Sequence, residues 1–371
     1  MNKTLTWVIV VIVVVLGIYL ITDNNQAPVT GEPIKLGFVG PLTGDASTLG
    51  ESARAAVSLA IEEINAEGGI NGNPVEVIYE DGRCTGNYAV DAVNKLINID
   101  NVHGIIGGLC SAETSAFAPI AEEAGVPTIS YCSSAPALSD AGDYIFRVYP
   151  SDSFQGIKAA NYLKEEMDFD QVAILYTNDD WGTGLKGTFS QEFEKLGGTI
   201  STIESFEKSS RDLRTQLTKI KSSNAQAIYW AGFADASIPG IGQYREFGLD
   251  IPVLGADAWD DPSLWESVGS SGEGFMFISV RTPENEEFRQ KLLSKTDQVT
   301  ICAPQSYDSV QVFKEAIESA GTDRENIKDA LYNIDGYQGV SGVISFNEKG
   351  DLLSAEYDIK MFTNGDIEVV N

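Results

Sequence analysis

The chain has 371 residues, of which 43% are hydrophobic and 21% are charged. This length exceeds what one hydrophobic core usually organises, so we expect two domains. The 54 acidic residues outnumber the 25 basic ones and give a net charge of −29. Nucleic acid is therefore an unexpected partner, because phosphate binding requires clustered Lys and Arg. Most of the acidic residues are expected to form a solvated surface.

The N-terminal segment differs in composition from the rest of the chain. Lys3 precedes an apolar run from Leu5 to Ile21, which is long for a signal-peptide core and short for a membrane span. Neither a small-x-small cleavage pattern nor a cysteine follows the run. Residues 1–31 are predicted to form an uncleaved membrane anchor with a polar tether, with a cleaved signal peptide as the alternative. In both cases Lys3 favours a location outside the cytoplasm for the main body.

From Ile34 onward, short β-rich runs alternate with amphipathic stretches. Ile34–Gly40 has the composition of a buried strand, and Leu49–Ala66 carries apolar residues at helical spacing. The next predicted elements, strands alternating with helices, are Pro74–Glu80, Tyr88–Ile99, Gly104–Gly107, Glu113–Glu123 and Val126–Ser130. This alternation predicts βαβ units and a parallel sheet.

The same alternation restarts after Pro150. Its predicted helices and strands are Gln155–Glu166, Val172–Tyr176, Gly184–Leu196, Ile200–Phe206, Leu213–Ser222, Ala227–Ala231, Ile238–Phe247 and Ile251–Leu254. The C-terminal part is predicted to contain helices near Glu286–Lys295, Ser306–Ala320 and Arg324–Tyr332, then strands near Val343–Phe346, Tyr357–Met361 and Ile367–Val370. Two doubly wound sheets are implied, and more than one crossing between them would form a hinge.

Two loops of the first sheet, residues 107–115 and 129–136, carry several hydroxyls and lie between a strand and a helix. Helix N-termini favour negative charge, so these loops suit a small carboxylate. Ligands of open α/β sheets lie beyond the carboxyl ends of the strands. The corresponding ends of the second sheet, which carry an acid and aromatic residues, are Asn178–Gly184, Ala231–Ala234 and Gly255–Asp260. If the two sheets face each other, these segments predict a site for a small zwitterion.

The cysteines and the histidine indicate neither a metal site nor an enzyme. Cys84, Cys110, Cys132 and Cys302 are widely spaced and form no CxxC pattern, and His103 is the single histidine. These features favour an oxidising compartment over zinc or haem, so no cofactor is expected. A phosphate loop of the type GxxxxGK[ST] is absent from the sequence. Cys110 or Cys132 with His103 as nucleophile and base is the enzymatic alternative, and a structural role for the histidine is favoured.

Three groups of residues resemble the type I periplasmic binding proteins. They are Gly40-Pro41-Leu42-Thr43-Gly44, Glu62-Glu63-Ile64-Asn65 with Gly68-Gly69-Ile70-Asn71-Gly72, and Phe146-Arg147 with Pro150-Ser151-Asp152. The branch that binds leucine, isoleucine and valine for ABC importers is the most similar. The resemblance implies an α/β fold of two Rossmann-like, doubly wound lobes joined by a hinge of three crossovers. Residues 32–150 and 281–335 would form lobe one, and residues 151–280 and 336–371 would form lobe two.

The resemblance also implies a set of ligand-binding residues. The resemblance implies that the ligand carboxylate is bound by Ser111, by the backbone of Cys132, and by the N–H and hydroxyl of Ser134. Asp257 would hold the ammonium group. The residues implied for the side-chain pocket are Leu49, Trp181 and Phe233. The family disulfide falls on Cys84 and Cys110, and a second bridge between Cys132 and Cys302 stays open.

Three departures from the family pattern leave the identity of the amino acid open. Leu49 offers no aromatic ring, Asp257 is shorter than the usual glutamate, and Trp181 is larger than the usual tyrosine. Ser111 and Ser134 as helix caps, Asp257 as a solvated loop acid and the aromatics as packing residues are the structural alternatives. Trp259 ranks below Trp181 as a lining residue, and Tyr307 is predicted to be core.

The expected partners are a small amino acid or related zwitterion, the membrane subunits of an ABC importer, and the membrane through the N-terminal segment. The alternative is a sensory ectodomain that binds an amide or another small polar solute and signals through a partner protein.

Overall fold

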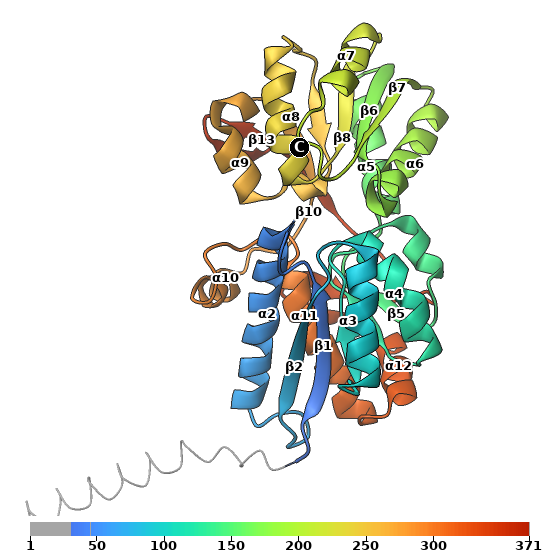
Figure 1. The fold of residues 1–371 in the computed structure, drawn as a ribbon, viewed down its shortest axis with the longest axis vertical. Helices are drawn as coiled ribbons and strands as arrows, with labels where there is room; N and C mark the ends of the chain where they lie inside the picture. Colours follow the sequence, from blue (N-terminus) through green and yellow to red (C-terminus); the bar gives the residue numbers. More distant parts are fainter. Residues whose placement is uncertain (1–30, 45, 371) are drawn as a thin grey trace, which may run out of the picture.

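The structure is a computed structural model that describes residues 31–44 and 46–370. The predicted anchor or signal peptide falls on residues 1–30, outside these ranges. Within residues 31–44 and 46–370, no helix is both long enough and apolar enough to cross a membrane. The described chain forms two α/β lobes, one above the other in Figure 1, and the fold class predicted from the sequence is confirmed.

Lobe one is built on a five-stranded parallel sheet with the order β2-β1-β3-β4-β5. Its strands are β1 (Ile34–Gly40), β2 (Val75–Asp81), β3 (Gly104–Ile106), β4 (Thr128–Ser130) and β5 (Ile145–Arg147). Its helices are α2 (Ser47–Ala66), α3 (Gly86–Asn98), α4 (Ser111–Glu123), η1 (Pro136–Asp140), α10 (Glu286–Leu293), α11 (Ala303–Ala320) and α12 (Arg324–Tyr332). Leu36 and Phe38 share a buried cluster with α2 and α11, whereas Val39 packs with α3 and α4, as strand alternation requires.

Lobe two is built on a seven-stranded sheet with the order β14-β13-β10-β9-β8-β6-β7. Its strands are β6 (Gln171–Thr177), β7 (Thr199–Phe206), β8 (Ala227–Ala231), β9 (Val253–Gly255), β10 (Met276–Val280), β13 (Tyr357–Thr363) and β14 (Asp366–Val369). Its helices are α5 (Asp152–Asn161), η2 (Tyr162–Glu166), α6 (Asp180–Lys195), α7 (Arg214–Ser222), α8 (Ala234–Glu246), η3 (Asp257–Trp259), α9 (Pro262–Val268) and η4 (Gly269–Gly272). Strands β6 to β10 pair in parallel, and β13 and β14 are antiparallel additions at one edge. Tyr229 packs toward α6, and its neighbour Trp230 packs toward α7 and α8.

The chain crosses between the lobes after β5, after β10 and before β13. The third crossing comes later than residue 336, because β11 (Tyr337–Gly339) and β12 (Gly342–Ile344) form a hairpin on lobe one. The hairpin is held there by Asp308 of α11, which accepts a hydrogen bond from the N–H of Val340 at 3.0 Å. Arg147 then pairs with Asp351 at 2.6 Å, so the chain leaves lobe one after this pair.

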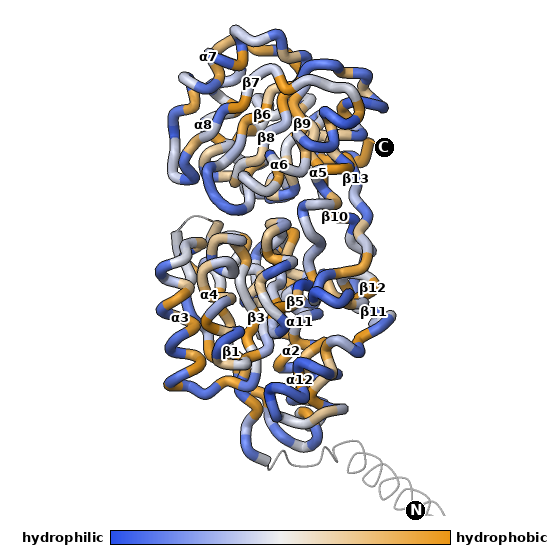
Figure 2. The backbone as a smooth tube through the Cα atoms, turned by 90° about the vertical axis from the view of Figure 1, so that its right-hand side faces the viewer, coloured by the Kyte–Doolittle hydropathy of each residue, from blue (hydrophilic) through white to orange (hydrophobic). Residues whose placement is uncertain are grey.

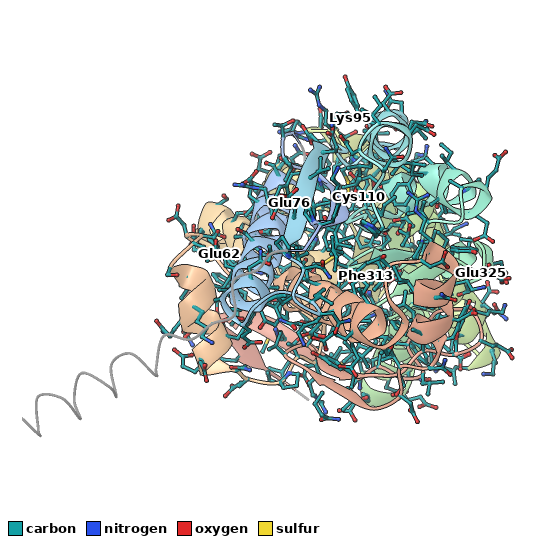
Figure 3. All side chains as sticks on the ribbon, turned by 90° about the horizontal axis from the view of Figure 1, so that it is seen from below. Glu62, Glu76, Lys95, Cys110, Phe313 and Glu325 are labelled. Carbon is teal, nitrogen blue, oxygen red and sulfur yellow. A yellow bond between two sulfur atoms is a disulfide. The ribbon has the colours of Figure 1, made fainter. Side chains whose placement is uncertain are left out.

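The hydropathy of the chain follows this architecture. Figure 2 shows the apolar segments of both lobes on the strands and on the inward faces of the helices. Figure 3, seen from below lobe one, shows Phe313 toward the interior, whereas Glu62, Lys95 and Glu325 lie toward the periphery. Because each lobe buries its own sheet between helices, the lobes are able to move as separate bodies about the crossings.

Candidate functional site

A cavity lies between the lobes, where loops that follow strands of both sheets meet. It has about 350 Å³ of empty space, its open mouth included. Its lining residues are Leu49, Leu109, Cys110, Ser111, Cys132, Ser134, Tyr149, Trp181, Phe233, Asp257, Ala258, Ile301 and Cys302. The ligand-binding residues predicted from the sequence all belong to this set: Ser111, Cys132, Ser134, Asp257, Trp181, Phe233 and Leu49. The structure therefore brings them together, and the role of each one stays a prediction.

Ser111 joins the two hydroxyl-rich loops of lobe one. It is the first residue of α4, and its Oγ accepts hydrogen bonds from the N–H of Ser134 at 3.2 Å and of Ala135 at 3.1 Å. A hydroxyl that accepts twice still has its own proton to donate. The N-cap positions of α4 and η1 are Cys110 and Ala135, so neither serine has the capping role considered as an alternative.

Ser134 links lobe one to the first helix of lobe two. Its Oγ donates to Oδ2 of Asp152 at 2.9 Å, and its carbonyl accepts from the N–H of Asp152 at 2.8 Å. Gln155, one turn further along α5, donates from Nε2 to Oδ1 of Asp152 at 3.1 Å. The carboxylate of Asp152 is thus held behind the cavity wall, next to the serine that faces it.

Asp257 forms the polar part of the wall from lobe two. It opens the short turn η3 directly after β9 and is only 4% exposed. Oη of Tyr149 donates to its Oδ2 at 2.7 Å, and its N–H donates to Oε1 of Gln155 at 3.1 Å. Gln155 therefore bridges Asp257 and Asp152. The cavity wall holds one acid and has a second acid immediately behind it.

Burial controls the ionisation of these two acids. It raises the pKa of Asp152 well above its usual value, and the neighbouring charge of Asp257 raises it further. Burial also raises the pKa of Asp257, and the hydrogen bond from Tyr149 offsets part of that rise. No basic residue belongs to the described lining of the cavity. A positively charged ligand group next to Asp257 would therefore offset the free-energy cost of ionising this buried carboxyl.

The rest of the cavity is apolar and aromatic. The ring centroids of Trp181 and Phe233 are 4.7 Å apart. Asp179 caps α6 by accepting from the N–H of Gly182 at 2.9 Å, which fixes the turn that carries Trp181. Leu49, Leu109 and Ile301 line the cavity from the side of lobe one. This wall is suited to an apolar group of the ligand.

Both disulfides lie against the cavity. Cys84 is bonded to Cys110, the pair implied by the family resemblance, and Cys132 is bonded to Cys302. The second bond ties the loop after β4 to the start of α11, across 170 residues of sequence. All four cysteines are therefore oxidised, and the thiol that the enzymatic alternative required is absent. His103 lies elsewhere, where its Nδ1 accepts from the N–H of Lys35 at 3.1 Å.

Sequence reasoning missed several residues of the site. Tyr149 and Asp152 belong to the Phe146–Asp152 crossing that carries part of the family resemblance, and that motif was the signal available for them. Ile301 precedes α11 in a segment without a motif of its own. Trp259, the weaker aromatic candidate, packs in the core of lobe two, where its Nε1 donates to Oγ of Ser237 at 2.9 Å.

Comparisons with known proteins agree with this geometry. A family described as periplasmic binding protein matches residues 33–360. The chain belongs to the periplasmic binding protein family. A "Leucine-, isoleucine-, valine-, threonine-, and alanine-binding protein" of Pseudomonas aeruginosa is 28% identical over 335 residues, which cover 88% of this chain and 89% of the relative. The family resemblance recognised in the sequence is confirmed.

Solved structures show the same relationship for this periplasmic binding protein. A leucine-binding protein, LivK, of Thermotoga maritima superimposes with a TM-score of 0.85 at 28% identity, covering 91% of this chain and 98% of that one. A branched-chain amino acid transporter substrate-binding protein, LivJ, of Streptococcus pneumoniae in complex with isoleucine has a TM-score of 0.83 at 27% identity, covering 91% and 99%. The chain is a solute-binding protein of two lobes.

Proposed function

We propose that this periplasmic binding protein captures a free α-amino acid with an apolar side chain and delivers it to the membrane subunits of an ABC importer. The observation that carries the proposal is the division of the cavity into a hydroxyl wall, a buried acid and an apolar wall. These parts complement the carboxylate, the ammonium and the side chain of one amino acid. Similarity to proteins named for leucine, isoleucine and valine supports the same ligand class.

The carboxylate end of the ligand is assigned to lobe one. Ser111 offers a hydroxyl proton. Ser134 lies beside it, and its N–H and hydroxyl, which donate to Ser111 and Asp152 in this structure, would turn to the carboxylate on binding. Cys132 contributes its backbone at the same loop. Hydrogen bonds to an ionised carboxylate are shorter and stronger than those between neutral groups, so a few such donors give firm binding.

The ammonium end is assigned to Asp257 of lobe two, oriented by Tyr149. The apolar side chain is assigned to Leu49, Trp181 and Phe233. A ligand bound in this way contacts both lobes, so it stabilises the closed arrangement over an open one. The importer subunits would then recognise the closed form. Residues 1–30 are proposed to tether the protein to the membrane outside the cytoplasm, and no catalytic role is proposed.

Calorimetric titration of the purified protein tests this proposal. L-Leucine should bind, whereas leucinamide, which lacks the carboxylate, and 4-methylpentanoate, which lacks the ammonium, should not. A second series, L-alanine, L-valine, L-isoleucine and L-phenylalanine, ranks the side chains. Binding of 4-methylpentanoate as tight as that of leucine would contradict the role of Asp257. Absence of heat with every free amino acid would reject the proposal.

A further inference from the structure

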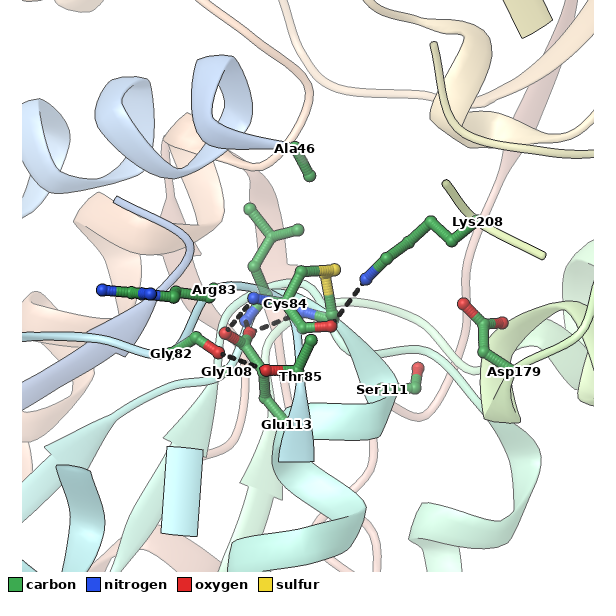
Figure 4. Close-up of a disulfide and its surroundings, with 12 residues drawn as sticks. Ala46, Gly82, Arg83, Cys84, Thr85, Gly108, Ser111, Glu113, Asp179 and Lys208 are labelled. Atoms are coloured by element: carbon green, nitrogen blue, oxygen red, sulfur yellow. Dashed lines mark hydrogen bonds between the residues drawn. A yellow bond between two sulfur atoms is a disulfide. The ribbon is translucent and has the colours of Figure 1, made fainter. Parts of the chain in front are cut away.

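One lysine of lobe two reaches across the mouth of the cleft to lobe one. Lys208 follows β7, and its Nζ donates to the carbonyl oxygen of Cys84 at 2.6 Å (Figure 4). Cys84 lies between β2 and α3 of lobe one. Neither residue lines the cavity, so this contact joins the lobes without belonging to the ligand site described above.

The acceptor of this hydrogen bond is rigidly connected to the carboxylate-binding loop. Cys84 is bonded through sulfur to Cys110, and its N–H donates to Oε1 of Glu113 at 3.0 Å. Oε2 of Glu113 accepts from the N–H groups of Leu109 at 3.1 Å and of Cys110 at 3.0 Å. Ser111 is the next residue in the chain. A displacement of the Cys84 carbonyl therefore also displaces the loop that is proposed to hold the ligand carboxylate.

The donor also lies near the apolar wall of lobe two. Nζ of Lys208 lies 5.9 Å from the ring centroid of Phe233, a cavity residue. Burial raises the pKa of Asp179, the cap of the helix that carries Trp181, to about 6, and the charge of Lys208 offsets part of that rise. Figure 4 shows Asp179 on the lobe-two side of the lysine and Glu113 on the other. The ammonium thus lies between acids of both lobes.

A second contact across the mouth is weaker. The N–H of Ala46 donates to Oδ2 of Asp235 at 3.4 Å, and the same carboxylate pairs with Arg211 at 3.4 Å. Each contact has one charged partner, and the Lys208 contact is the shorter, at 2.6 Å against 3.4 Å. It is the better candidate for a contact that decides how long the cleft stays closed.

We propose that Lys208 is a latch: a positioning residue that holds lobe two against the Cys84–Cys110 loop and slows reopening of the cleft. Opening separates Nζ from the Cys84 carbonyl, whereas entry of ligand into the open form does not involve this bond. The latch therefore lowers the dissociation rate. Because it also holds the ligand-free lobes together and ligand enters the open form, it lowers the association rate as well. Its effect on bound ligand rests on the proposed function, and its effect on the lobes themselves does not.

The test compares Lys208→Met with Lys219→Met in the full-length protein. Methionine keeps an apolar stem over Phe233 and removes the charge. Lys219 is the matched control, since it pairs with Glu204 at 2.7 Å and lies on α7, at the end of lobe two remote from lobe one (Figure 1). With L-leucine as the probe, Lys208→Met should dissociate about 10-fold faster in stopped-flow fluorescence, the size expected for one charged hydrogen bond. The association rate of Lys208→Met should be at least as high as that of Lys219→Met, because ligand enters the open form.

A ligand-free measurement separates the latch from the proposed function. Small-angle scattering without ligand should give a larger radius of gyration for Lys208→Met than for Lys219→Met and the wild type. If that difference is seen while no form binds leucine, the latch is supported and the ligand assignment is rejected. If leucine binds but Lys208→Met and Lys219→Met agree in both dissociation rate and scattering, the latch is overturned. Equal scattering without any leucine binding overturns both proposals.

Discussion

The phenol of Tyr149 and the carboxylate of Asp257 are hydrogen-bonded at 2.7 Å, although 108 residues separate them in sequence. Tyr149 lies on the first crossing of the hinge, and Asp257 lies at the end of β9 in lobe two. Both side chains are buried, at 1% and 4% exposure. The crossing that carries Tyr149 therefore orients Asp257, the proposed partner of the ligand ammonium. A movement of the hinge would change the position of this charge.

Tyr149→Phe removes that hydrogen bond and leaves the carboxylate of Asp257 without its phenolic donor. Because hydrogen bonds to charged groups contribute about 1.5–3 kcal/mol, amino-acid binding should weaken by about that amount. Titration calorimetry at neutral pH measures the change. Tyr332→Phe is the control, since its Oη donates to the carbonyl of Asp143 on lobe one at 3.1 Å, away from the cavity. Equal affinities for the two variants would show that the phenol of Tyr149 does not hold Asp257 for the ligand.

Ligand affinity should rise with pH. The free protein has raised pKa values at Asp152 and Asp257, and a bound ammonium group favours their ionised forms. At low pH the ligand must displace protons, so affinity falls as pH falls through the pKa values of the free protein. Titrations between about pH 5 and pH 8, in buffers of different ionisation enthalpy, would detect the proton release. Asp257→Asn should abolish amino-acid binding, and wild-type affinity in that variant would be inconsistent with this account.

Ser111→Ala should lower both affinity and stability. The hydroxyl accepts from two buried N–H groups, of Ser134 and Ala135, which alanine would leave without an acceptor. Each lost acceptor costs about 1–3 kcal/mol, and loss of the ligand contact should weaken binding by about 1.5–3 kcal/mol. Thermal melts with and without ligand separate the two effects. Ser115→Ala, on the same helix but outside the cavity lining, should change neither.

Glu113→Gln should change how stability depends on pH. Burial raises the pKa of Glu113 from 4.5 to about 7, despite three hydrogen bonds from backbone N–H groups. The unfolded chain therefore loses this proton at lower pH than the folded chain does. The free energy of unfolding should fall by about 3 kcal/mol as pH rises from 4.5 to about 7 because of this group.

Urea unfolding at pH values below and above this interval measures the effect of Glu113. The glutamine variant should lose that part of the slope, whereas Glu123→Gln, exposed at the end of the same helix, should keep it. An unchanged slope in Glu113→Gln would show that the carboxyl is ionised throughout this pH range.

Trp181→Ala should alter which amino acid binds best. The indole is 5% exposed and packs against Phe233, so its removal enlarges the side-chain pocket. Loss of a central aromatic contact typically costs 2 kcal/mol or more, so leucine binding should weaken by about that amount. Phenylalanine should lose less, because its ring can occupy the space left by the indole. A uniform loss across all amino acids, measured by competition, would place the side-chain pocket elsewhere.

Much of the fold could be predicted from local pattern. The helix Leu49–Ala66 corresponds to α2, and the strand Ile34–Gly40 is β1 with the same bounds. The strands β5 and β10 were not predicted. β10 is buried at every position and lies between β9 and β13, so its run Met276–Val280 shows no alternation to distinguish it from a buried helix or loop.

The loops that carry the site could be predicted because each follows a strand of the βαβ pattern, and the individual residues were implied by the family resemblance. Ser111, Trp181 and Asp257 all lie within a few residues of a strand end, which is a property of the sequence and of parallel topology. The pair of Asp152 and Asp257, bridged by Gln155, had no such signal. Its members lie on α5 and η3 of lobe two, more than 100 residues apart in the chain, and their proximity depends on how these two elements pack.

By itself, the sequence determined the alternation of strands and helices, the presence of two lobes and the loops that face the cleft. These features follow from burial periodicity and turn chemistry, which act over a few residues. The tertiary structure alone decided that Tyr149 orients Asp257, that Cys132 pairs with Cys302 and that the hairpin after α12 stays on lobe one. Those contacts join residues far apart in the chain, and their energies depend on the relative position of whole elements, which no local pattern encodes.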